Sequence, residues 1–229
     1  MERNGKQFYT VGGKLIDISN WDINGSIADF ERNYGWEGAM AYGNLVHDEL
    51  NQHGLGIKPG DVYLDLGANI GMSALRAELC GASKLYCIEP DPGVYKALEM
   101  NKSDKWETFN LAIADYDGEI NIPRWPNWRD NVLRSCITLE NFIYSNKISH
   151  IDYMKVDIEG HEIQIMPQIT KAIYNKISKM FVEYHEDTTI SNEERDANRL
   201  KFIESILSKG YNNFHVHLGW AQSWLYFWK

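Results

Sequence analysis

The stretch from Val62 to Glu89 constrains the fold more than any other part of the sequence. An apolar run, Val62-Tyr63-Leu64, breaks at the turn Asp65-Leu-Gly-Ala-Asn-Ile-Gly71, and a helix is expected from there to about Leu79. The chain becomes apolar again over residues 84–88 and ends in the carboxylate of Glu89. Strand, glycine turn, helix and second strand in this order predict one βαβ unit of a parallel sheet.

The glycine turn has the composition of a ligand-binding turn. Gly67 and Gly71 lack Cβ atoms where the backbone must bend and where a ligand and the next helix come close. Asn69 tolerates left-handed dihedral angles, and the start of the helix after Gly71 would suit a carboxylate or phosphate. Glu89 lies 24 positions after Asp65. A carboxylate at this distance is where dinucleotide-binding folds hold a ribose diol.

The spacing of the turn separates two cofactor classes. A nicotinamide or flavin fingerprint needs Gly-x-Gly-x-x-Gly, so that a pyrophosphate can approach the backbone. This turn reads Asp-x-Gly-x-x-x-Gly, and no Gly-x-Gly-x-x-Gly run exists in the chain. A smaller nucleoside with an amino-acid tail, S-adenosylmethionine, is therefore the favoured cofactor.

Three segments carry a resemblance to a known family. The turn at 65–71, Ile88-Glu-Pro-Asp-Pro92 and Leu98-Glu-Met-Asn101 are similar to the S-adenosylmethionine site of class I methyltransferases. The segment Ile151-Asp-Tyr-Met-Lys-Val-Asp-Ile-Glu-Gly-His-Glu162 resembles the signature of one branch, the FkbM-type methyltransferases. The resemblance extends from about Leu55 to His185. It implies an O-methyltransferase acting on sugar or polyketide hydroxyls.

The cofactor site expected from the turn and the resemblance draws on four strand ends. The resemblance implies that Asn110 to Ala112 lie beside the adenine and that Asp157 faces the methionine end of the cofactor or the acceptor. The predicted cofactor-binding residues are Asp65, Gly67, Ala68, Asn69, Gly71, Glu89, Pro90, Asn110, Ala112 and Asp157.

The fold class predicted for the chain is α/β. We expect a Rossmann-like class I methyltransferase sheet, mostly parallel, with an antiparallel C-terminal hairpin and helices on both faces. Residues 1–54 are expected to form an N-terminal hairpin, over 7–19, and a covering helix, over 36–53; residues 55–229 form the methyltransferase domain. Further strands are predicted at 108–114, 150–158, 179–185, 213–218 and 222–228, and further helices at 92–100, 138–146, 162–174 and 191–208.

The catalytic candidates are polar residues at the ends of the strands predicted at 150–158 and 179–185. Methyl transfer to an aliphatic hydroxyl needs a base within hydrogen-bond reach of its proton. His185 or His161 is the preferred base because an imidazole titrates near neutral pH. Asp157 and Glu159 complete the set of candidates. For each histidine, a solvated or core-satisfied role is the competing interpretation.

A divalent cation is an alternative use of the same region. Asp157, Glu159, Glu183 and His185 offer ligands for a cation that would bind and acidify a sugar diol. The cation is not required by the sequence. His215 and His217 share one strand face, for which packing or solvation is a better explanation than zinc. Lys155 is too basic to act as a base unless it is buried, and pairing with a carboxylate is its expected role.

The segment from Gly118 to Cys136 has the most unusual composition in the chain. It contains two tryptophans, two prolines and three arginines between Pro123 and Arg134. Such a loop could stack on a sugar face or grip an anionic substituent. A loop pinned by its own aromatic side chains is the alternative.

The overall composition limits the partners and the compartment. The net charge of −9 argues against a nucleic-acid partner, because nucleic-acid affinity depends on basic patches. Three cysteines without Cys-x-x-Cys spacing, and no apolar run of spanning or signal length, indicate a cytoplasmic protein without a membrane span. The predicted partner is a small-molecule or glycan hydroxyl acceptor. The oligomeric state is not predicted.

Two other functions remain as alternatives at this stage. One is a non-catalytic protein that binds S-adenosylmethionine or carbohydrate, which the tryptophan-rich segments would suit. The other is an NAD(P)-dependent oxidoreductase, which the βαβ outline would suit and the missing glycine fingerprint disfavours.

Overall fold

The structure, a computed structural model, describes residues 2–3, 6–11, 14–17, 50, 55–123, 131–219 and 221–229. The main sheet consists of β4 (Val62–Leu66), β5 (Lys84–Ile88), β6 (Trp106–Phe109), β10 (Ile151–Val156), β11 (Ile177–His185), β12 (Asn213–Leu218) and β13 (Gln222–Trp228). The helices are α2 (Met72–Leu79), α3 (Pro92–Asn101), α4 (Leu139–Ser145), α5 (Glu162–Ile165), α6 (Lys171–Tyr174) and α7 (Asn192–Leu207).

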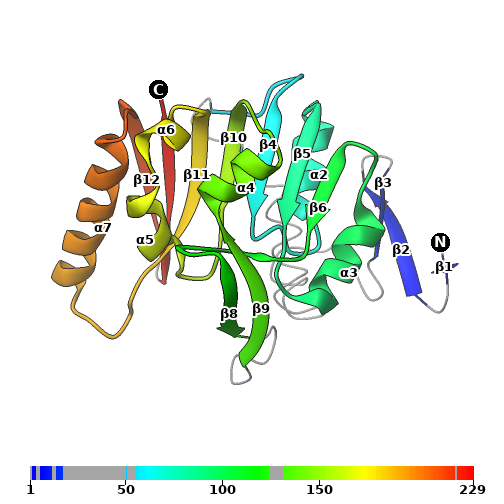
Figure 1. The fold of residues 1–229 in the computed structure, drawn as a ribbon, viewed down its shortest axis with the longest axis horizontal. Helices are drawn as coiled ribbons and strands as arrows, with labels where there is room; N and C mark the ends of the chain where they lie inside the picture. Colours follow the sequence, from blue (N-terminus) through cyan, green and yellow to red (C-terminus); the bar gives the residue numbers. More distant parts are fainter. Residues whose placement is uncertain are drawn as a thin grey trace.

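The main sheet has the strand order β12-β13-β11-β10-β4-β5-β6 (Figure 1). Strands β11, β10, β4, β5 and β6 each pair in parallel with the next, whereas β13 pairs antiparallel with both β11 and β12. This arrangement confirms the predicted α/β class with a mostly parallel sheet and an antiparallel C-terminal hairpin.

Helices cover both faces of the sheet because successive side chains in each strand alternate between two apolar cores. In β4, Leu64 belongs to the core under α4, α5 and α7, while Tyr63 belongs to the core under α2 and α3. Met154 and Tyr153 of β10 divide in the same way. Figure 1 shows α4 and α5 in front of the sheet and α2 behind it.

Residues 108–114, predicted as a strand and its exit, contribute to two strands in two sheets. After β6 the chain turns at Asn110 and continues as β7 (Ala112–Ala114), which pairs with β9 (Asn131–Thr138) outside the main sheet. The Asn110 side chain donates to the carbonyl oxygens of Glu89 and Pro90 at 2.8 and 3.1 Å. These bonds fix the bend that separates the two strands.

The tryptophan- and arginine-rich segment is framed by strands and is not one loop. Residues Gly118–Pro123 form β8, which pairs antiparallel with β9. The hairpin of β8 and β9 extends below the sheet in Figure 1. Residues 124–130, which include Trp125 and Trp128, lie outside the described residues, so their predicted contact with a sugar remains a prediction.

The predicted helix at 162–174 is also wrong, because it is broken into α5, a 3-10 turn (Met166–Gln168) and α6. Pro167 lies in that 3-10 turn and has no N–H to continue the hydrogen-bond ladder. By contrast, α7 begins as predicted. Ser191 and Glu194 form both bonds of a capping box.

The N-terminal part is described only in pieces. Strands β2 (Lys6–Val11) and β3 (Lys14–Asp17) pair antiparallel, as the predicted hairpin requires, and β1 (Glu2–Arg3) pairs with β2. The predicted helix at 36–53 lies outside the described residues except for the buried Leu50. The domain division after residue 54 therefore stays a prediction. Within the described part, no helix is long and apolar enough to cross a bilayer.

Candidate active site

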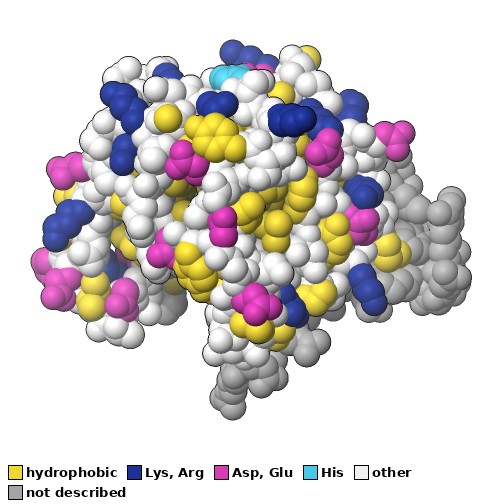
Figure 2. Space-filling model, viewed as in Figure 1, with side chains coloured by type: hydrophobic (Ala, Val, Ile, Leu, Met, Phe, Trp, Pro, Cys, Tyr) yellow, Lys and Arg dark blue, Asp and Glu magenta, His cyan; other side chains and the backbone are white. Residues whose placement is uncertain are grey.

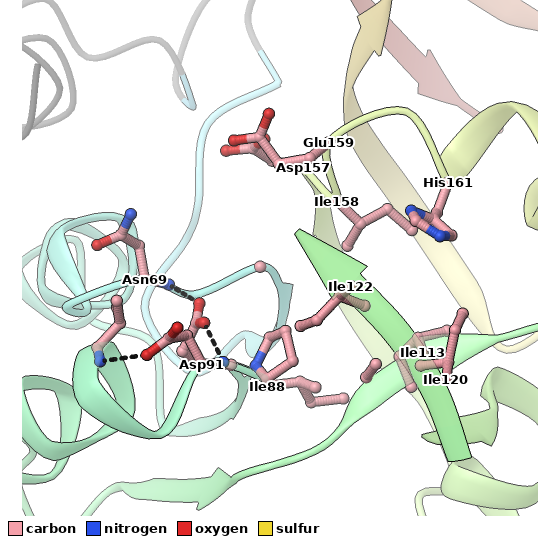
Figure 3. A pocket seen from close by; sticks show the side chains of 15 residues that line it. Asn69, Ile88, Asp91, Ile113, Ile120, Ile122, Asp157, Ile158, Glu159 and His161 are labelled. Carbon is pink, nitrogen blue, oxygen red and sulfur yellow. Dashed lines mark hydrogen bonds between the residues drawn. The ribbon is translucent and has the colours of Figure 1, made fainter. Parts of the chain in front are cut away.

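A pocket lies at the carboxyl ends of β4, β5 and β10, where open α/β sheets bind ligands. Its walls come from these strand ends, from the start of α3 and from β7 and β8. Figure 3 shows Asn69 and Asp91 on one side of the pocket and His161 on the opposite side, with Asp157 and Glu159 between them. The residues that line it are Gly67, Asn69, Ile88, Glu89, Pro90, Asp91, Val94, Ala112, Ile113, Ile120, Ile122, Asp157, Ile158, Glu159 and His161.

The glycine turn brings the end of β4 against the end of β10. Gly67 has a φ of 81°, and a Cβ atom on it would stand 1.7 Å from the carbonyl oxygen of Asp157. Gly71 has a φ of 93°, and a Cβ atom there would stand 2.6 Å from the Trp106 ring. Asn69 is left-handed too, with a φ of 50°. At both glycines the atoms that come close therefore belong to the protein's own strands and not to a ligand. Gly67 and Asn69 nevertheless line the pocket.

Glu89 is held by the backbone on both of its oxygens. The amide of Asn69 donates to Oε2 at 3.0 Å, and the amide of Asp91 donates to Oε1 at 2.8 Å (Figure 3). Burial favours the neutral acid and outweighs these two donors, so the pKa of Glu89 rises to about 7. A carboxylate fixed in this way presents its remaining lone pairs to the pocket.

Lys155 ties the turn to the acidic residues around it. Its Nζ donates to the carbonyl oxygen of Gly67 at 3.0 Å and to Oδ2 of Asp157 at 3.1 Å. The ammonium also forms an ion pair with the fully buried Asp65, at 3.3 Å from its Oδ1, while Oδ2 of Asp65 accepts a hydrogen bond from Ser73. Burial lowers the pKa of Lys155, but Asp157 and Asp65 outweigh it and raise the pKa. The predicted pairing of Lys155 with a carboxylate is confirmed.

The predicted cofactor residues divide into those that reach the pocket and those behind it. Gly67, Asn69, Glu89, Pro90, Ala112 and Asp157 line it. Asp65 lies underneath, Ala68 and Gly71 shape the turn, and Asn110 fixes the Glu89-Pro90 backbone. The amides of Gly67 and Ala68 both donate to the carbonyl oxygen of Ile88. The four residues behind the pocket therefore support the lining without facing it.

The acceptor-side candidates sit on a turn of unusual backbone conformation. Glu159 and Gly160 follow β10 with φ angles of 55° and 97°. A non-glycine residue in this region is strained by about 1–3 kcal/mol and needs support from its surroundings. This turn brings Glu159 and His161 to the pocket beside Asp157.

His185 lies behind that turn and not in the pocket lining. Its Nδ1 is 3.1 Å from Oε1 of Glu162, and its Nε2 is 3.4 Å from Oε2 of Glu159. Burial disfavours the imidazolium, but hydrogen bonds to Glu159 and Glu162 outweigh it and raise the pKa of His185 to about 11. The expectation that this imidazole titrates near neutral pH does not hold in this arrangement, because two carboxylates stabilise its charged form.

One group of side chains has the composition of a cation site. Asp157, Glu183 and His185 bring ligand-type atoms within 4.8 Å of one another. Glu183 and His185 alternate along β11 and so share a face of the sheet. Three of the four residues considered for a cation are therefore brought together, while Glu159 is not among them. The use of a metal stays a prediction.

Sequence reasoning missed the apolar wall and one buried carboxylate. Ile88, Ile113, Ile120, Ile122 and Ile158 line the pocket, and the alternation of Ile120 with Ile122 was a strand signal in a segment interpreted as a loop. Glu162 is completely buried and bonds to Gly160 and His185. No local pattern marks a glutamate at a helix start as buried.

Comparisons with known proteins agree with this geometry. Residues 124–212 match the family model described as Methyltransferase FkbM domain. Two curated relatives are similar at low identity. The hexuronic acid methyltransferase AglP of Haloferax volcanii is 23% identical over 138 residues, covering 55% of this chain and 56% of the relative. The 31-O-demethyl-FK506 methyltransferase FkbM of Streptomyces tacrolimicus is 22% identical over 180 residues, covering 59% and 69%. The alignment thus spans little more than half of the first relative.

Among solved structures, the fibrillarin of Aeropyrum pernix with natively bound S-adenosyl-L-methionine has a similar fold. Its TM-score is 0.52 at 14% identity, over 99% of this chain and 84% of the fibrillarin. At this level of identity the likeness concerns the fold alone.

Proposed function

We propose that this chain, which matches the FkbM methyltransferase domain model over residues 124–212, transfers a methyl group from S-adenosylmethionine to a hydroxyl of a sugar, glycoconjugate or related small molecule. The observation that carries the proposal is the Glu89 carboxylate, fixed by the amides of Asn69 and Asp91 at the edge of a pocket beside the glycine turn. A carboxylate that is held on both oxygens offers two ribose hydroxyls a rigid acceptor.

The nucleoside end of the cofactor fits the apolar part of the pocket. Pro90, Val94 and Ala112 lie near Glu89 and, together with the isoleucines, offer a dry surface for a flat ring. The methionine end then extends along Gly67 toward Asp157. In this proposal Asp65 acts from below, through Lys155, by holding the carbonyl of Gly67.

The acceptor hydroxyl is proposed to meet Asp157, Glu159 and His161, which line the pocket just after the end of β10. His161 is the proposed base, since its ring faces the pocket and His185 is held between two carboxylates. The sulfonium of the cofactor supplies the electrophile. These side chains then orient the hydroxyl oxygen for in-line attack and accept its proton.

The acceptor class is proposed from the chemistry of the site and the names of the relatives. One relative is named for a hexuronic acid and the other for an oxygen position, 31-O. Among the described lining residues, the charged side chains on the acceptor side are carboxylates, and they favour a hydroxyl donor over an anion at that position. We propose a small acceptor and no nucleic-acid partner.

The proposal is tested first by isothermal titration of the whole chain with S-adenosylmethionine, S-adenosylhomocysteine and NADH. We expect micromolar binding of the two sulfur nucleosides and none of NADH. Purified protein is then incubated with methyl-labelled S-adenosylmethionine and a panel of neutral sugars, uronic acids and their glycosides, with and without Mg²⁺. We expect label in at least one hydroxyl acceptor.

Two results would contradict the proposal. If neither sulfur nucleoside binds, the glycine turn has only a structural role. If Glu89→Ala leaves the affinity for S-adenosylhomocysteine unchanged, the cofactor does not lie where we propose.

A further inference from the structure

Glu162 is a buried carboxylate on which three donors converge. Its side chain is 0% exposed. Oε2 accepts the backbone N–H of Gly160 at 2.9 Å, and Oε1 accepts the backbone N–H of His185, also at 2.9 Å. The ring Nδ1 of His185 lies 3.1 Å from the same Oε1. One side chain thus joins the turn after β10 to the last residue of β11.

The first bond supports the strained turn that carries the acceptor-side residues. Glu159 and Gly160 both have left-handed backbone conformations, and the Glu162 carboxylate accepts a hydrogen bond from the backbone N–H of Gly160. The same turn contains His161, whose amide donates to the carbonyl of Ile158 at 3.2 Å. Without an acceptor for the Gly160 amide, the turn at Glu159 loses one of these two described bonds and keeps only the one between His161 and Ile158.

The other two bonds fix His185. Because a carboxylate can only accept, the Nδ1 facing Glu162 must carry a proton, and the ring orientation is set. The opposite nitrogen, Nε2, then faces the Glu159 carboxylate at 3.4 Å. Glu162, His185 and Glu159 form a chain that leads from a buried helix start to a side chain that is 54% exposed beside the pocket.

Only a carboxylate can serve at position 162. A glutamine has nearly the same size, but one end of its amide accepts and the other donates. Whichever way it turned, an N–H would oppose either the Gly160 amide or the two His185 donors. An aspartate accepts at both oxygens but is one methylene shorter, so it cannot reach both partners from the same Cα position.

We propose that Glu162 is a positioning residue for the acceptor side of methyl transfer. It fixes the Glu159-Gly160 turn directly, and it orients His185, which in turn holds the Glu159 carboxylate. Glu159 then meets the acceptor hydroxyl. This inference rests on the proposed function and adds to it a residue that touches neither substrate. It predicts that Glu162 controls the chemical step and leaves the cofactor half of the pocket unchanged.

The test compares the whole chain with Glu162→Gln, Glu162→Asp and Glu159→Gln. With an acceptor from the sugar panel, we expect Glu162→Gln to lower kcat about 100-fold, the effect of a misplacement near 1 Å. The affinity for S-adenosylhomocysteine should change less than about twofold. In the double variant Glu159→Gln/Glu162→Gln, the loss should be no larger than in the worse single variant, because both changes disrupt one unit.

A control variant is Glu78→Ala, because both described donors reach one oxygen of Glu78, Oε2, which the amide oxygen of a glutamine could replace. The Glu78 carboxylate also joins two elements, accepting from Ser103 and from the Trp106 indole at 2.8 and 2.7 Å, and it lies outside the pocket lining. This control should lower the melting temperature without changing kcat. Parallel loss of melting temperature, cofactor affinity and kcat in Glu162→Gln would show a structural role only and overturn the inference. Additive losses in the double variant would overturn it as well.

A measurement on the unchanged protein tests the orientation of His185 even if the variants do not fold. Long-range ¹H–¹⁵N NMR of the histidine side chains should find a slowly exchanging proton on Nδ1 of His185. A freely exchanging Nδ1 proton would contradict the bond to Glu162. If no sulfur nucleoside binds at all, the proposed function fails, while this spectrum still decides whether Glu162 orients His185.

Discussion

At the scale of single residues, burial and hydrogen bonding act in opposite directions on the Glu89 carboxyl. Burial favours the neutral acid, whereas the amides of Asp91 and Asn69 favour the carboxylate. Burial dominates, which raises the pKa to about 7 from an ordinary value of 4.5. In the free protein this group adds stability below about pH 4.5, and that stability is lost as the pH rises through 7.

Cofactor affinity should show the reverse pH dependence, because ribose hydroxyls donate to the ionised carboxylate. With a pKa of about 7, the ionised fraction rises about tenfold between pH 6 and pH 8. We expect the dissociation constant for S-adenosylhomocysteine to fall by about the same factor, measured by titration calorimetry. Glu89→Gln should bind more weakly and with little pH dependence. An equal slope in this variant would assign the effect to another group.

Gly67 and Gly160 provide a matched pair of left-handed glycines. At Gly67 a Cβ atom would overlap the carbonyl of Asp157, while at Gly160 nothing lies within 4 Å. Gly160→Ala should cost about 1–2 kcal/mol of unfolding free energy, the backbone penalty alone. Gly67→Ala should cost more than about 3 kcal/mol, because β4 and β10 must separate. Urea unfolding measures both, and equal losses would contradict the steric explanation.

At the scale of elements, the β8–β9 hairpin contributes side chains from one face to the pocket. Ile120 and Ile122 line it, and Leu133, paired with Asn121, belongs to the opposite face and is 51% exposed. The hairpin therefore forms an apolar wall of the pocket, against which the nucleoside would lie in the proposed function.

Shortening that wall should weaken cofactor binding without harming the fold. Ile122→Ala removes methyl and methylene groups from the pocket, and we expect about tenfold weaker binding of S-adenosylhomocysteine. Leu133→Ala changes the same hairpin on its other face and should bind normally. Titration calorimetry with both variants makes the comparison. If Leu133→Ala weakens binding equally, the wall's effect arises from hairpin stability and not from contact.

At the scale of the whole molecule, acidic residues outnumber basic ones, 32 to 23. On the face shown in Figure 2, Lys and Arg side chains are interspersed with Asp and Glu, and the chain carries a net charge of −9. A phosphate backbone gains affinity from several cations acting together. We therefore expect no retardation of a labelled tRNA or a single-stranded RNA by micromolar protein at 150 mM salt. A salt-sensitive complex would contradict the proposed small acceptor.

The sequence could predict the parts of this molecule that depend on local chemistry. The glycine turn, the capping box of Ser191 and the antiparallel hairpin of β12 and β13 each follow from residue types at short spacing. The chain from Glu162 through His185 to Glu159 could not be predicted, because it joins residues whose proximity depends on the parallel pairing of β10 and β11. The division of 108–114 between two sheets likewise depends on Asn110 reaching carbonyls at the end of β5.

The contact between Gly67 and Asp157 has a consequence for motion. Only a hydrogen atom separates the Gly67 Cα from the neighbouring carbonyl, and Lys155 bonds to the backbone on one side and the side chain on the other. The ends of β4 and β10 therefore move as one rigid body. If the cofactor and the acceptor bind as proposed, the relative position of Gly67 and Asp157 stays the same from one turnover to the next.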